Sequence, residues 1–178
     1  RFEKVKRPEV CLNSFEELLK ISENKKYKLT MIGDGNMKNY IEGKSLEIMN
    51  IYSERAKIEL INFQKDISNF YLNADIFLHT AEYEGLGNVI IEAALYGLPI
   101  VSTNYKYGIE TINQYASINK VNCYASALEI AKEINFCCDN LSALTNLQKQ
   151  NYMNIKEAFS GKEINQKIFN MIRYNSHL

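Results

Sequence analysis

The sequence has no excess of charge of either sign. Its 21 lysine and arginine residues balance 21 aspartate and glutamate residues, so the formal net charge at neutral pH is zero. Proteins that bind nucleic acid through its phosphate backbone ordinarily carry an excess of basic charge, overall or on one face. The composition therefore gives no electrostatic reason to expect a nucleic acid partner.

Long apolar runs are also absent. No stretch approaches the roughly 18 consecutive apolar residues of a membrane-spanning helix, and no signal peptide is visible. The sequence lacks repeats, low-complexity segments and an obvious linker, and its 178 residues suit one domain. The chain begins with Arg1 instead of a methionine, so we expect a fragment of a longer protein.

Cysteine is scarce, and its positions lack the pattern of a metal site or a disulfide framework. The four residues Cys11, Cys123, Cys137 and Cys138 contain no Cys-x-x-Cys spacing. Zinc sites and the disulfide frameworks of small secreted domains both have recognisable spacings. We therefore expect reduced thiols, as in a cytoplasmic protein.

What the sequence does contain is an alternation of strand and helix signals. Strands are expected at residues 27–32, 57–63, 75–80, 98–102 and 116–121. Helices are expected from Pro8, at 37–49 with a break near Gly43, after a cap at Asp66, within 81–103, along 124–138, and at 141–158 and 162–174. This order predicts an α/β fold, a Rossmann-like parallel sheet with helices on both faces. Ligands of such sheets bind beyond the carboxyl ends of the strands.

Two features near the expected strand ends allow more than one interpretation. Gly33-Asp34-Gly35 follows the first strand, but Lys38 stands where a dinucleotide-binding fingerprint has its third glycine. A tight strand-to-helix turn is therefore favoured there. His79 could act as a base, but it lies in an apolar strand, where a histidine is more often structural.

The stretch from Ala81 to Thr103 is the one around which the rest of the chain is organised. Glu92 is the single charged residue between Gly85 and Tyr105, and the apolar residues around it indicate a buried helix. A carboxylate in such a helix is costly unless it is paired or meets a polar ligand. It could be tied to a neighbouring backbone amide or a lysine, or it could bind a ligand.

The spacing of the residues before this helix adds information. Glu84 lies eight residues before Glu92, and Gly85 and Gly87 let the backbone turn sharply. The first amides of the helix would be unpaired donors, which favour an anion such as a phosphate. Two carboxylates would repel a phosphate, so hydroxyls are their natural partners. A diphosphate with one sugar on either side satisfies this geometry.

The segment Glu84-Gly-Leu-Gly-Asn-Val-Ile-Ile-Glu92-Ala-Ala-Leu-Tyr-Gly97-Leu-Pro99-Ile-Val resembles a known signature. It is similar to the E-x7-E motif of retaining glycosyltransferases with the GT-B fold, and most closely to glycosyltransferase family 4. The resemblance implies that the chain is the C-terminal, donor-binding half of such an enzyme. Residues 1–160 would form the nucleotide-sugar-binding domain. A helix at 161–178 would pack on this domain or on an N-terminal domain outside the chain.

The resemblance also implies roles for individual residues. Arg1 and Lys6 match family cations that contact the donor diphosphate, although the family's preceding glycine and strand are missing. Their spacing alone would favour a solvated basic end, and the downstream motif reverses that preference. Glu84 would contact the transferred sugar and Glu92 would hold the ribose. Arg1, Lys6 and Glu84 are therefore the expected catalytic residues.

Further donor-binding residues follow from the same resemblance. Phe63 and Gln64 match the family segment that packs against the nucleotide base, although Asn62 replaces a frequent glycine. Phe63 could also be a core strand residue. The expected donor-binding set is completed by Gly85, Gly87, Asn88 and Val89, the last three through backbone amides that meet the phosphate or the sugar.

The implied reaction is transfer of a hexose or N-acetylhexosamine from a UDP- or GDP-linked donor, with retention of anomeric configuration. The implied acceptor is a growing surface polysaccharide, lipopolysaccharide or lipid-linked glycan, bound by an N-terminal domain, so this chain alone should be inactive. No metal, other cofactor or enzyme nucleophile is expected. The resemblance also implies a cytoplasmic location at the inner face of the plasma membrane, with peripheral membrane association of the full-length protein.

Three alternatives stay open at this point. They are a nucleotide-sugar-binding domain without transferase activity, a sugar epimerase with the GT-B architecture, and an unrelated Rossmann-like interaction domain. Intact Arg1, Lys6 and Glu84 argue against the first alternative. The third requires the whole motif to be a coincidence.

Overall fold

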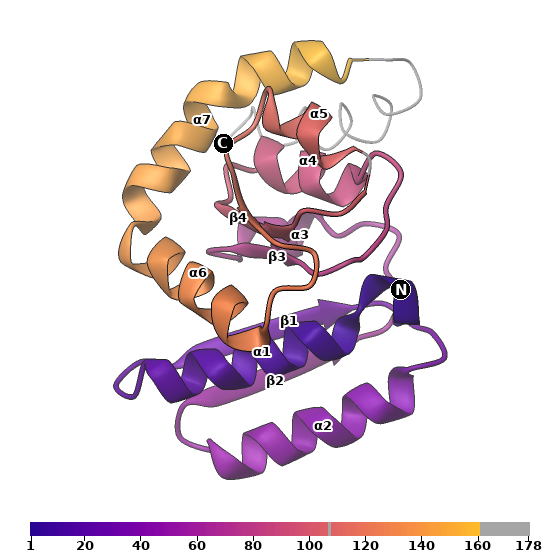
Figure 1. The fold of residues 1–178 in the computed structure, drawn as a ribbon, viewed down its shortest axis with the longest axis vertical. Helices are drawn as coiled ribbons and strands as arrows, with labels where there is room; N and C mark the ends of the chain where they lie inside the picture. Colours follow the sequence, from indigo (N-terminus) through magenta and orange to yellow (C-terminus); the bar gives the residue numbers. More distant parts are fainter. Residues whose placement is uncertain (107, 161–178) are drawn as a thin grey trace.

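The computed structural model describes residues 1–106 and 108–160, which alternate between strands and helices (Figure 1). The strands are β1 (Tyr27–Ile32), β2 (Ala56–Ile61), β3 (Phe77–His79), β4 (Ile100–Thr103) and β5 (Ile118–Val121). The helices are the 3-10 turn η1 (Lys4–Lys6), α1 (Pro8–Ile21), α2 (Lys38–Ile51), α3 (Ser68–Leu72), α4 (Asn88–Leu95), α5 (Ile109–Asn113), α6 (Ala127–Asp139) and α7 (Leu141–Ala158). The helix expected at 162–174, the C-terminal helix expected at 161–178 and residue Tyr107 lie outside the described residues.

The strand pairings are parallel, as the sequence predicts, but they form two sheets instead of the single expected one. β1 pairs with β2, placing Tyr27 opposite Ala56, while β3, β4 and β5 form a second sheet in that order. In Figure 1, β1 lies between β2 and the β3–β4 pair. Side chains join the two sheets, because Leu78 of β3 packs against the apolar cluster of β1 and β2.

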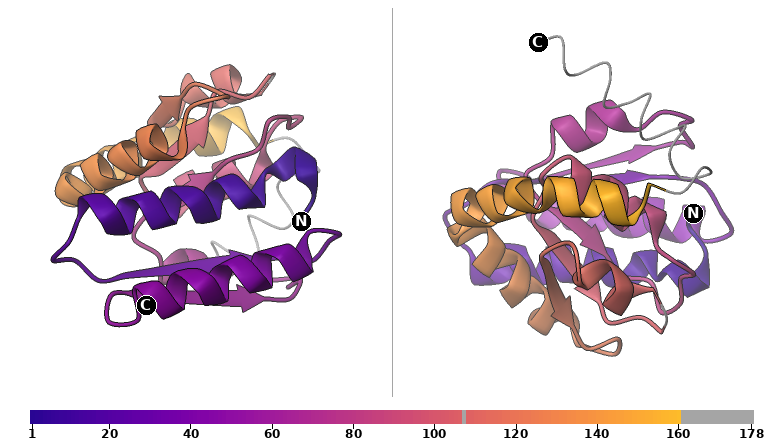
Figure 2. Two further views of the ribbon diagram at one scale, coloured as in Figure 1. Left: turned by 60° about the horizontal axis from the view of Figure 1, so that its bottom comes forward. Right: turned by 90° about the horizontal axis from the view of Figure 1, so that it is seen from above.

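Helices cover both sheets and bury three apolar clusters. The first cluster joins α1 and α2 to β1 and β2, and the second joins α1 and α6 to β4. The third surrounds α4 and includes Ile100 of β4, Ile112 of α5 and Ile155 of α7. Figures 1 and 2 both show α6 beside α1, with α7 at the end of the molecule opposite α2. The α/β fold class with parallel sheets and helices on both faces is thus confirmed.

The N-terminal segment lies between the carboxyl ends of β1 and β3. The backbone of Phe2 is hydrogen-bonded to both Asp34 and Met37, in the loop after β1. Val5 accepts a hydrogen bond from the amide of Glu82, in the loop after β3, at 3.0 Å. Residues 1–7 therefore lie at the edge of the sheets where parallel α/β proteins bind ligands.

Several expected boundaries are corrected by the structure. The second strand ends at Ile61 instead of residue 63, which leaves Phe63 in a loop with 74% of its surface exposed. Helix α2 continues through Gly43 without the expected break, because Ile41 and Ile48 are buried and this packing outweighs the roughly 1 kcal/mol cost of a helical glycine.

Smaller corrections concern the ends of other elements. Asp66 accepts a hydrogen bond from the first amide of α3, at Ser68, although the N-cap position itself is Ile67. The third strand shortens from 75–80 to 77–79, and the last from 116–121 to 118–121. Helix α6 starts at Ala127 after a capping box, which leaves Tyr124 outside the helix.

Candidate functional site

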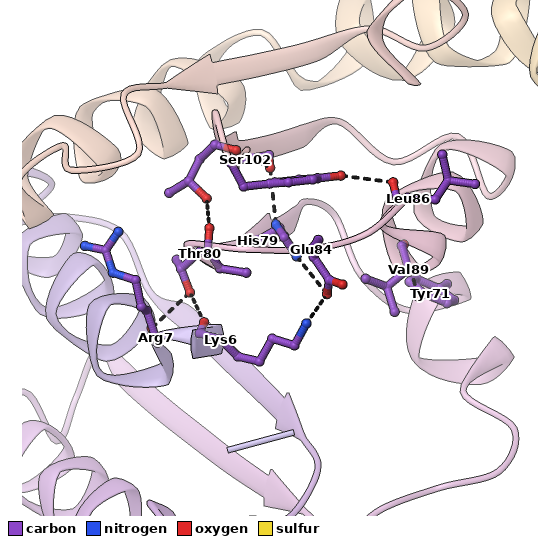
Figure 3. A network of polar contacts seen from close by, with 12 residues as sticks. Lys6, Arg7, Tyr71, His79, Thr80, Glu84, Leu86, Val89 and Ser102 are labelled. Carbon is purple, nitrogen blue, oxygen red and sulfur yellow. Dashed lines mark hydrogen bonds and ion pairs between the residues drawn. The ribbon is translucent and has the colours of Figure 1, made fainter. Parts of the chain in front are cut away.

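A basic turn at the start of the chain places the first functional group. The turn η1 ends at Lys6, the next residue Arg7 adopts a left-handed conformation, and Pro8 then begins α1. The hydroxyl of Thr80, directly after β3, donates to the carbonyl oxygens of Lys6 and Arg7 at 3.2 and 3.0 Å. These bonds tie the turn to the end of β3, and the Lys6 side chain extends towards Glu84 (Figure 3).

Lys6 and Glu84 form a close ion pair. Lys6 Nζ lies 2.6 Å from Glu84 Oε1, and each side chain is about one fifth exposed. Sequence analysis assigned both residues to catalysis, and the structure brings them into contact although Lys6 lies in η1 and Glu84 in the loop between β3 and α4. The pair places one cation and one carboxylate side by side at the carboxyl ends of the strands.

His79 is a second neighbour of Glu84. Its Nε2 lies 3.6 Å from Glu84 Oε1, and its Nδ1 lies 3.3 Å from the hydroxyl of Ser102 in β4. The imidazole of His79 and the ammonium of Lys6 hold the pKa of Glu84 at about 2, against the opposing effect of partial burial. Glu84 is therefore ionised throughout the physiological pH range. His79 is buried, as the structural interpretation predicted, and it contacts a candidate catalytic carboxylate.

The glycine-rich loop between β3 and α4 is held by Tyr105. This buried tyrosine follows β4, and its hydroxyl donates to the carbonyl oxygen of Leu86 at 3.1 Å. Its ring also packs edge-on against His79, with the ring centroids 5.2 Å apart. Sequence reasoning did not identify Tyr105 or Ser102. The signal that could have found them is their position at the carboxyl end of a parallel strand.

Gly87 directly precedes α4, and two features of this position require a glycine. It occupies the N-cap position with a φ of +82°, which a residue with a side chain rarely adopts. A Cβ atom at this position would also collide with the Tyr105 hydroxyl. Within the described residues the N-cap of α4 makes no side-chain hydrogen bond, and the first amides of a helix have no partner inside the helix, which suits them to bind an anion.

We expect Gly87→Ala to lower the free energy of unfolding by about 2–4 kcal/mol, from backbone strain and the steric conflict with Tyr105. Gly43→Ala is the matched control. Gly43 lies on the exposed side of α2 with nothing within 4 Å of a new Cβ, so alanine should stabilise by about 1 kcal/mol. Denaturant unfolding of both variants measures the difference. Equal stability of the two would contradict this account of the loop.

Glu92 lies half-buried on α4, and one of its partners is Tyr71. The Tyr71 hydroxyl donates to Glu92 Oε2 at 3.0 Å and also lies 3.3 Å from the carbonyl oxygen of Val89. The helix is buried as predicted, with Ile90 and Ile91 fully enclosed. Sequence reasoning expected a backbone amide, a lysine or a ligand as the partner of Glu92 and did not anticipate a tyrosine.

A separate hollow lies at the carboxyl ends of β1 and β2. It has a volume of about 330 Å³ and is lined by Arg1, Ile32, Gly33, Asp34, Phe63, Gln64 and Ile67. Arg1, from the expected catalytic set, thus shares one cavity with Phe63 and Gln64, from the expected donor-binding set. The exposure of Phe63 is inconsistent with the alternative that it is a core residue. Gly33, in the loop that joins β1 to α2, forms part of the wall.

Within residues 1–106 and 108–160, no three histidine, cysteine, aspartate or glutamate side chains gather in a way that could hold a metal ion. The expectation that donor binding needs no metal stays a prediction. In the same described part of the chain, no helix has the length and apolar character needed to cross a membrane. All four cysteines are free thiols.

Residues 1–165 match the family model described as "Glycosyl transferases group 1". The chain belongs to this family. Its curated relatives include the amylovoran biosynthesis glycosyltransferase AmsD of Erwinia amylovora, 34% identical over 98 residues, which span 53% of this chain and 27% of AmsD. The capsular polysaccharide biosynthesis glycosyltransferase CapM of Staphylococcus aureus is 29% identical over 118 residues, or 65% of this chain and 30% of CapM. This group 1 chain therefore spans less than a third of the length of these relatives.

Solved structures place the group 1 chain in the GT-B fold. TarM has a TM-score of 0.73 and 20% identity, covering 96% of this chain and 33% of TarM. HepE of Anabaena, solved in complex with UDP, has a TM-score of 0.73 and 19% identity, covering 98% of this chain and 47% of HepE. WaaG, a glycosyltransferase involved in lipopolysaccharide biosynthesis, has a TM-score of 0.69 and 17% identity, covering 96% of this chain and 44% of WaaG. At these identities the similarity establishes the fold alone.

Proposed function

We propose that this chain is the donor-binding C-terminal domain of a retaining glycosyltransferase of family 4. The enzyme transfers a hexose or N-acetylhexosamine from a UDP- or GDP-linked donor to a growing surface polysaccharide, lipopolysaccharide or lipid-linked glycan. The observation that carries the proposal is the Lys6–Glu84 pair, 2.6 Å apart beside the N-terminus of α4. The names of AmsD and CapM, which place those proteins in polysaccharide biosynthesis, support the acceptor class.

On the sugar side, Glu84 accepts hydrogen bonds from hydroxyls of the transferred sugar. Lys6 and Arg1 neutralise the charge that grows on the departing nucleoside diphosphate as its bond to the anomeric carbon breaks. The first amides of α4, at Gly87, Asn88 and Val89, contact the phosphate or the sugar, and Gly85 lets the loop approach them. We assign no nucleophile and no metal.

On the nucleotide side, Phe63 and Gln64 pack against the base, and Glu92 holds the ribose. The support for a shared ligand is the hollow at the ends of β1 and β2, in which Arg1 lies with Phe63 and Gln64. The complex of HepE with UDP supports the ligand class. The acceptor binds a second domain, and the complete enzyme works in the cytoplasm at the inner face of the plasma membrane, to which it attaches peripherally.

We expect this chain to bind UDP or GDP weakly, with affinity that falls as salt concentration rises, because Lys6 and Arg1 supply cationic contacts. Calorimetry at two ionic strengths is the measurement. Lys6→Gln should weaken binding about tenfold and reduce the salt dependence. Lys4→Gln, an exposed position in the same turn, should change neither.

Two outcomes would overturn the proposal. The first is the absence of binding of either nucleotide at millimolar concentration. The second is sugar turnover by this chain alone with donor and acceptor present, which would contradict the requirement for a second domain. In a protein that joins this chain to an acceptor-binding domain, transfer with inversion of the anomeric configuration would contradict the retaining mechanism. Conversion of the donor sugar to its epimer without transfer would favour an epimerase.

A further inference from the structure

We propose that Tyr71 is a positioning residue for the nucleotide. Its hydroxyl holds the carboxylate of Glu92 in the orientation that accepts hydrogen bonds from the ribose. This inference rests on the proposed function, in which Glu92 binds the ribose, and it adds a residue from a different element of the fold. Tyr71 lies on α3, whereas Glu92 lies on α4.

The contact joins one donor to two acceptors on a single face of α4. Tyr71 Oη lies 3.0 Å from Glu92 Oε2 and 3.3 Å from the carbonyl oxygen of Val89, three residues earlier. A phenol has one proton to donate, and the shorter distance and negative charge favour the carboxylate. A carboxylate has about four acceptor sites, so one bond to Tyr71 is compatible with bonds to ribose hydroxyls.

The Tyr71 ring is itself held rigidly by packing. Only 5% of its surface is exposed, and it belongs to the apolar cluster that includes Ile90. It stacks on Tyr96, with the ring centroids 5.2 Å apart and the planes 18° from parallel, and it also contacts Phe77 at 5.9 Å. A glutamate has three rotatable side-chain bonds, so a bond to a fixed hydroxyl reduces the freedom that it would lose on binding.

The hydroxyl remains a donor over the whole working pH range. Burial and the adjacent charge of Glu92 raise the pKa of Tyr71 well above its ordinary value. Its ionisation beside the carboxylate would place two negative charges in contact, which is why the proton stays on the phenol. The interaction therefore behaves as a permanent orienting contact and not as a switch.

The test is Tyr71→Phe, which removes the hydroxyl and keeps the ring. Calorimetry would compare UDP with its 2′-deoxy and 3′-deoxy counterparts, or the equivalent GDP series if the unmodified chain binds GDP. We expect the dissociation constant for UDP to rise about 3–10-fold. We also expect the ratio of dissociation constants between deoxy-UDP and UDP to move towards one, because the variant no longer orients the ribose-binding carboxylate. Because both ligands meet the same protein sample, this ratio is insensitive to partial unfolding.

Tyr96→Phe is the matched control. Its ring stacks on Tyr71, but its buried hydroxyl has no hydrogen-bond partner in the part of the chain that the structure describes. Removing this hydroxyl should leave the UDP affinity and the deoxy-UDP ratio unchanged. In a Glu92→Gln background, Tyr71→Phe should have little further effect on UDP, because the charge that it orients is already gone.

The outcomes separate this inference from the proposed function. If the unmodified chain binds UDP or GDP but Tyr71→Phe binds it equally well, Tyr71 is not a positioning residue. The inference is also overturned if the variant loses affinity for UDP and deoxy-UDP by the same factor, because that result reports a structural role. If the unmodified chain binds neither nucleotide, the proposed function fails first and this inference fails with it.

Discussion

Glu84→Gln is expected to reduce sugar transfer about 100-fold or more, in a protein that joins this chain to an acceptor-binding domain. Glutamine has the same shape but lacks the charge that lies 2.6 Å from Lys6 and 3.6 Å from His79. Loss of a preorganised charged group at the reacting centre commonly costs a factor of about 100–1,000 in kcat. The decrease should appear mainly in kcat if the contacts of Glu84 strengthen in the transition state.

Free UDP or GDP should still bind this variant with nearly unchanged affinity, because no sugar is present for Glu84 to contact. Glu82→Gln is the control. Glu82 is exposed in the same loop, where it accepts a hydrogen bond from Tyr124, and its replacement should leave transfer unchanged. A Glu84→Gln protein that transfers sugar at the unmodified rate, or that no longer binds free nucleoside diphosphate, would show that the role given to Glu84 is wrong.

Glu84→Gln should also lower the free energy of unfolding, by an amount that depends on pH. The pKa of Glu84 is about 2 in the folded chain, below its ordinary value of 4.5, so ionised Glu84 stabilises the fold. This contribution is fully present above about pH 4.5 and is lost as the pH falls towards 2. We expect the unmodified chain to exceed Glu84→Gln in unfolding free energy by about 1–3 kcal/mol at pH 7, with the difference shrinking on acidification. Denaturant titrations between pH 7 and pH 3 measure it.

Glu92→Gln should weaken binding of the whole nucleotide about 10–100-fold, which is the loss of a charged hydrogen bond worth about 1.5–3 kcal/mol. Free UDP or GDP and the sugar donor should be affected to the same extent, because all of them carry the ribose. The amide oxygen of glutamine can still accept the hydrogen bond from Tyr71, so the packing of α4 against α3 should be unchanged. Calorimetry with the free nucleotide, and KM for the donor, are the measurements.

Thermal unfolding provides the control for Glu92→Gln. If Glu92 has only a structural role, its replacement should lower the melting temperature without a nucleotide-specific defect. We expect the reverse, with a small change in melting temperature and a clear loss of affinity. If Glu92→Gln retains full affinity for free diphosphate while Glu84→Gln loses it, the two carboxylates have been assigned to the wrong sides of the donor.

The sequence by itself determined most of the local elements and membership of a glycosyltransferase family, whereas the assignment to family 4 stays a prediction. Helix α4 is predictable because apolar residues surround Glu92 on nearly every side and glycines stand near both ends, at Gly87 and Gly97. The alternation of strands and helices likewise predicted parallel pairing, and the glycine-rich loop lies at a carboxyl end because it follows β3 directly in the chain. These signals are local, because periodicity and turn chemistry act over a few neighbouring residues.

The tertiary structure alone decided which residues meet. Lys6 reaches Glu84 because residues 1–7 lie between the ends of β1 and β3, and Tyr71 reaches Glu92 because α3 packs against α4. Phe63 is exposed because the β1–β2 ladder ends with Ile32 opposite Ile61. The division of the strands into two sheets also depends on contacts between residues that are far apart in the sequence. Such contacts depend on burial summed over the whole chain, so no pattern along the sequence specifies which distant side chains come together.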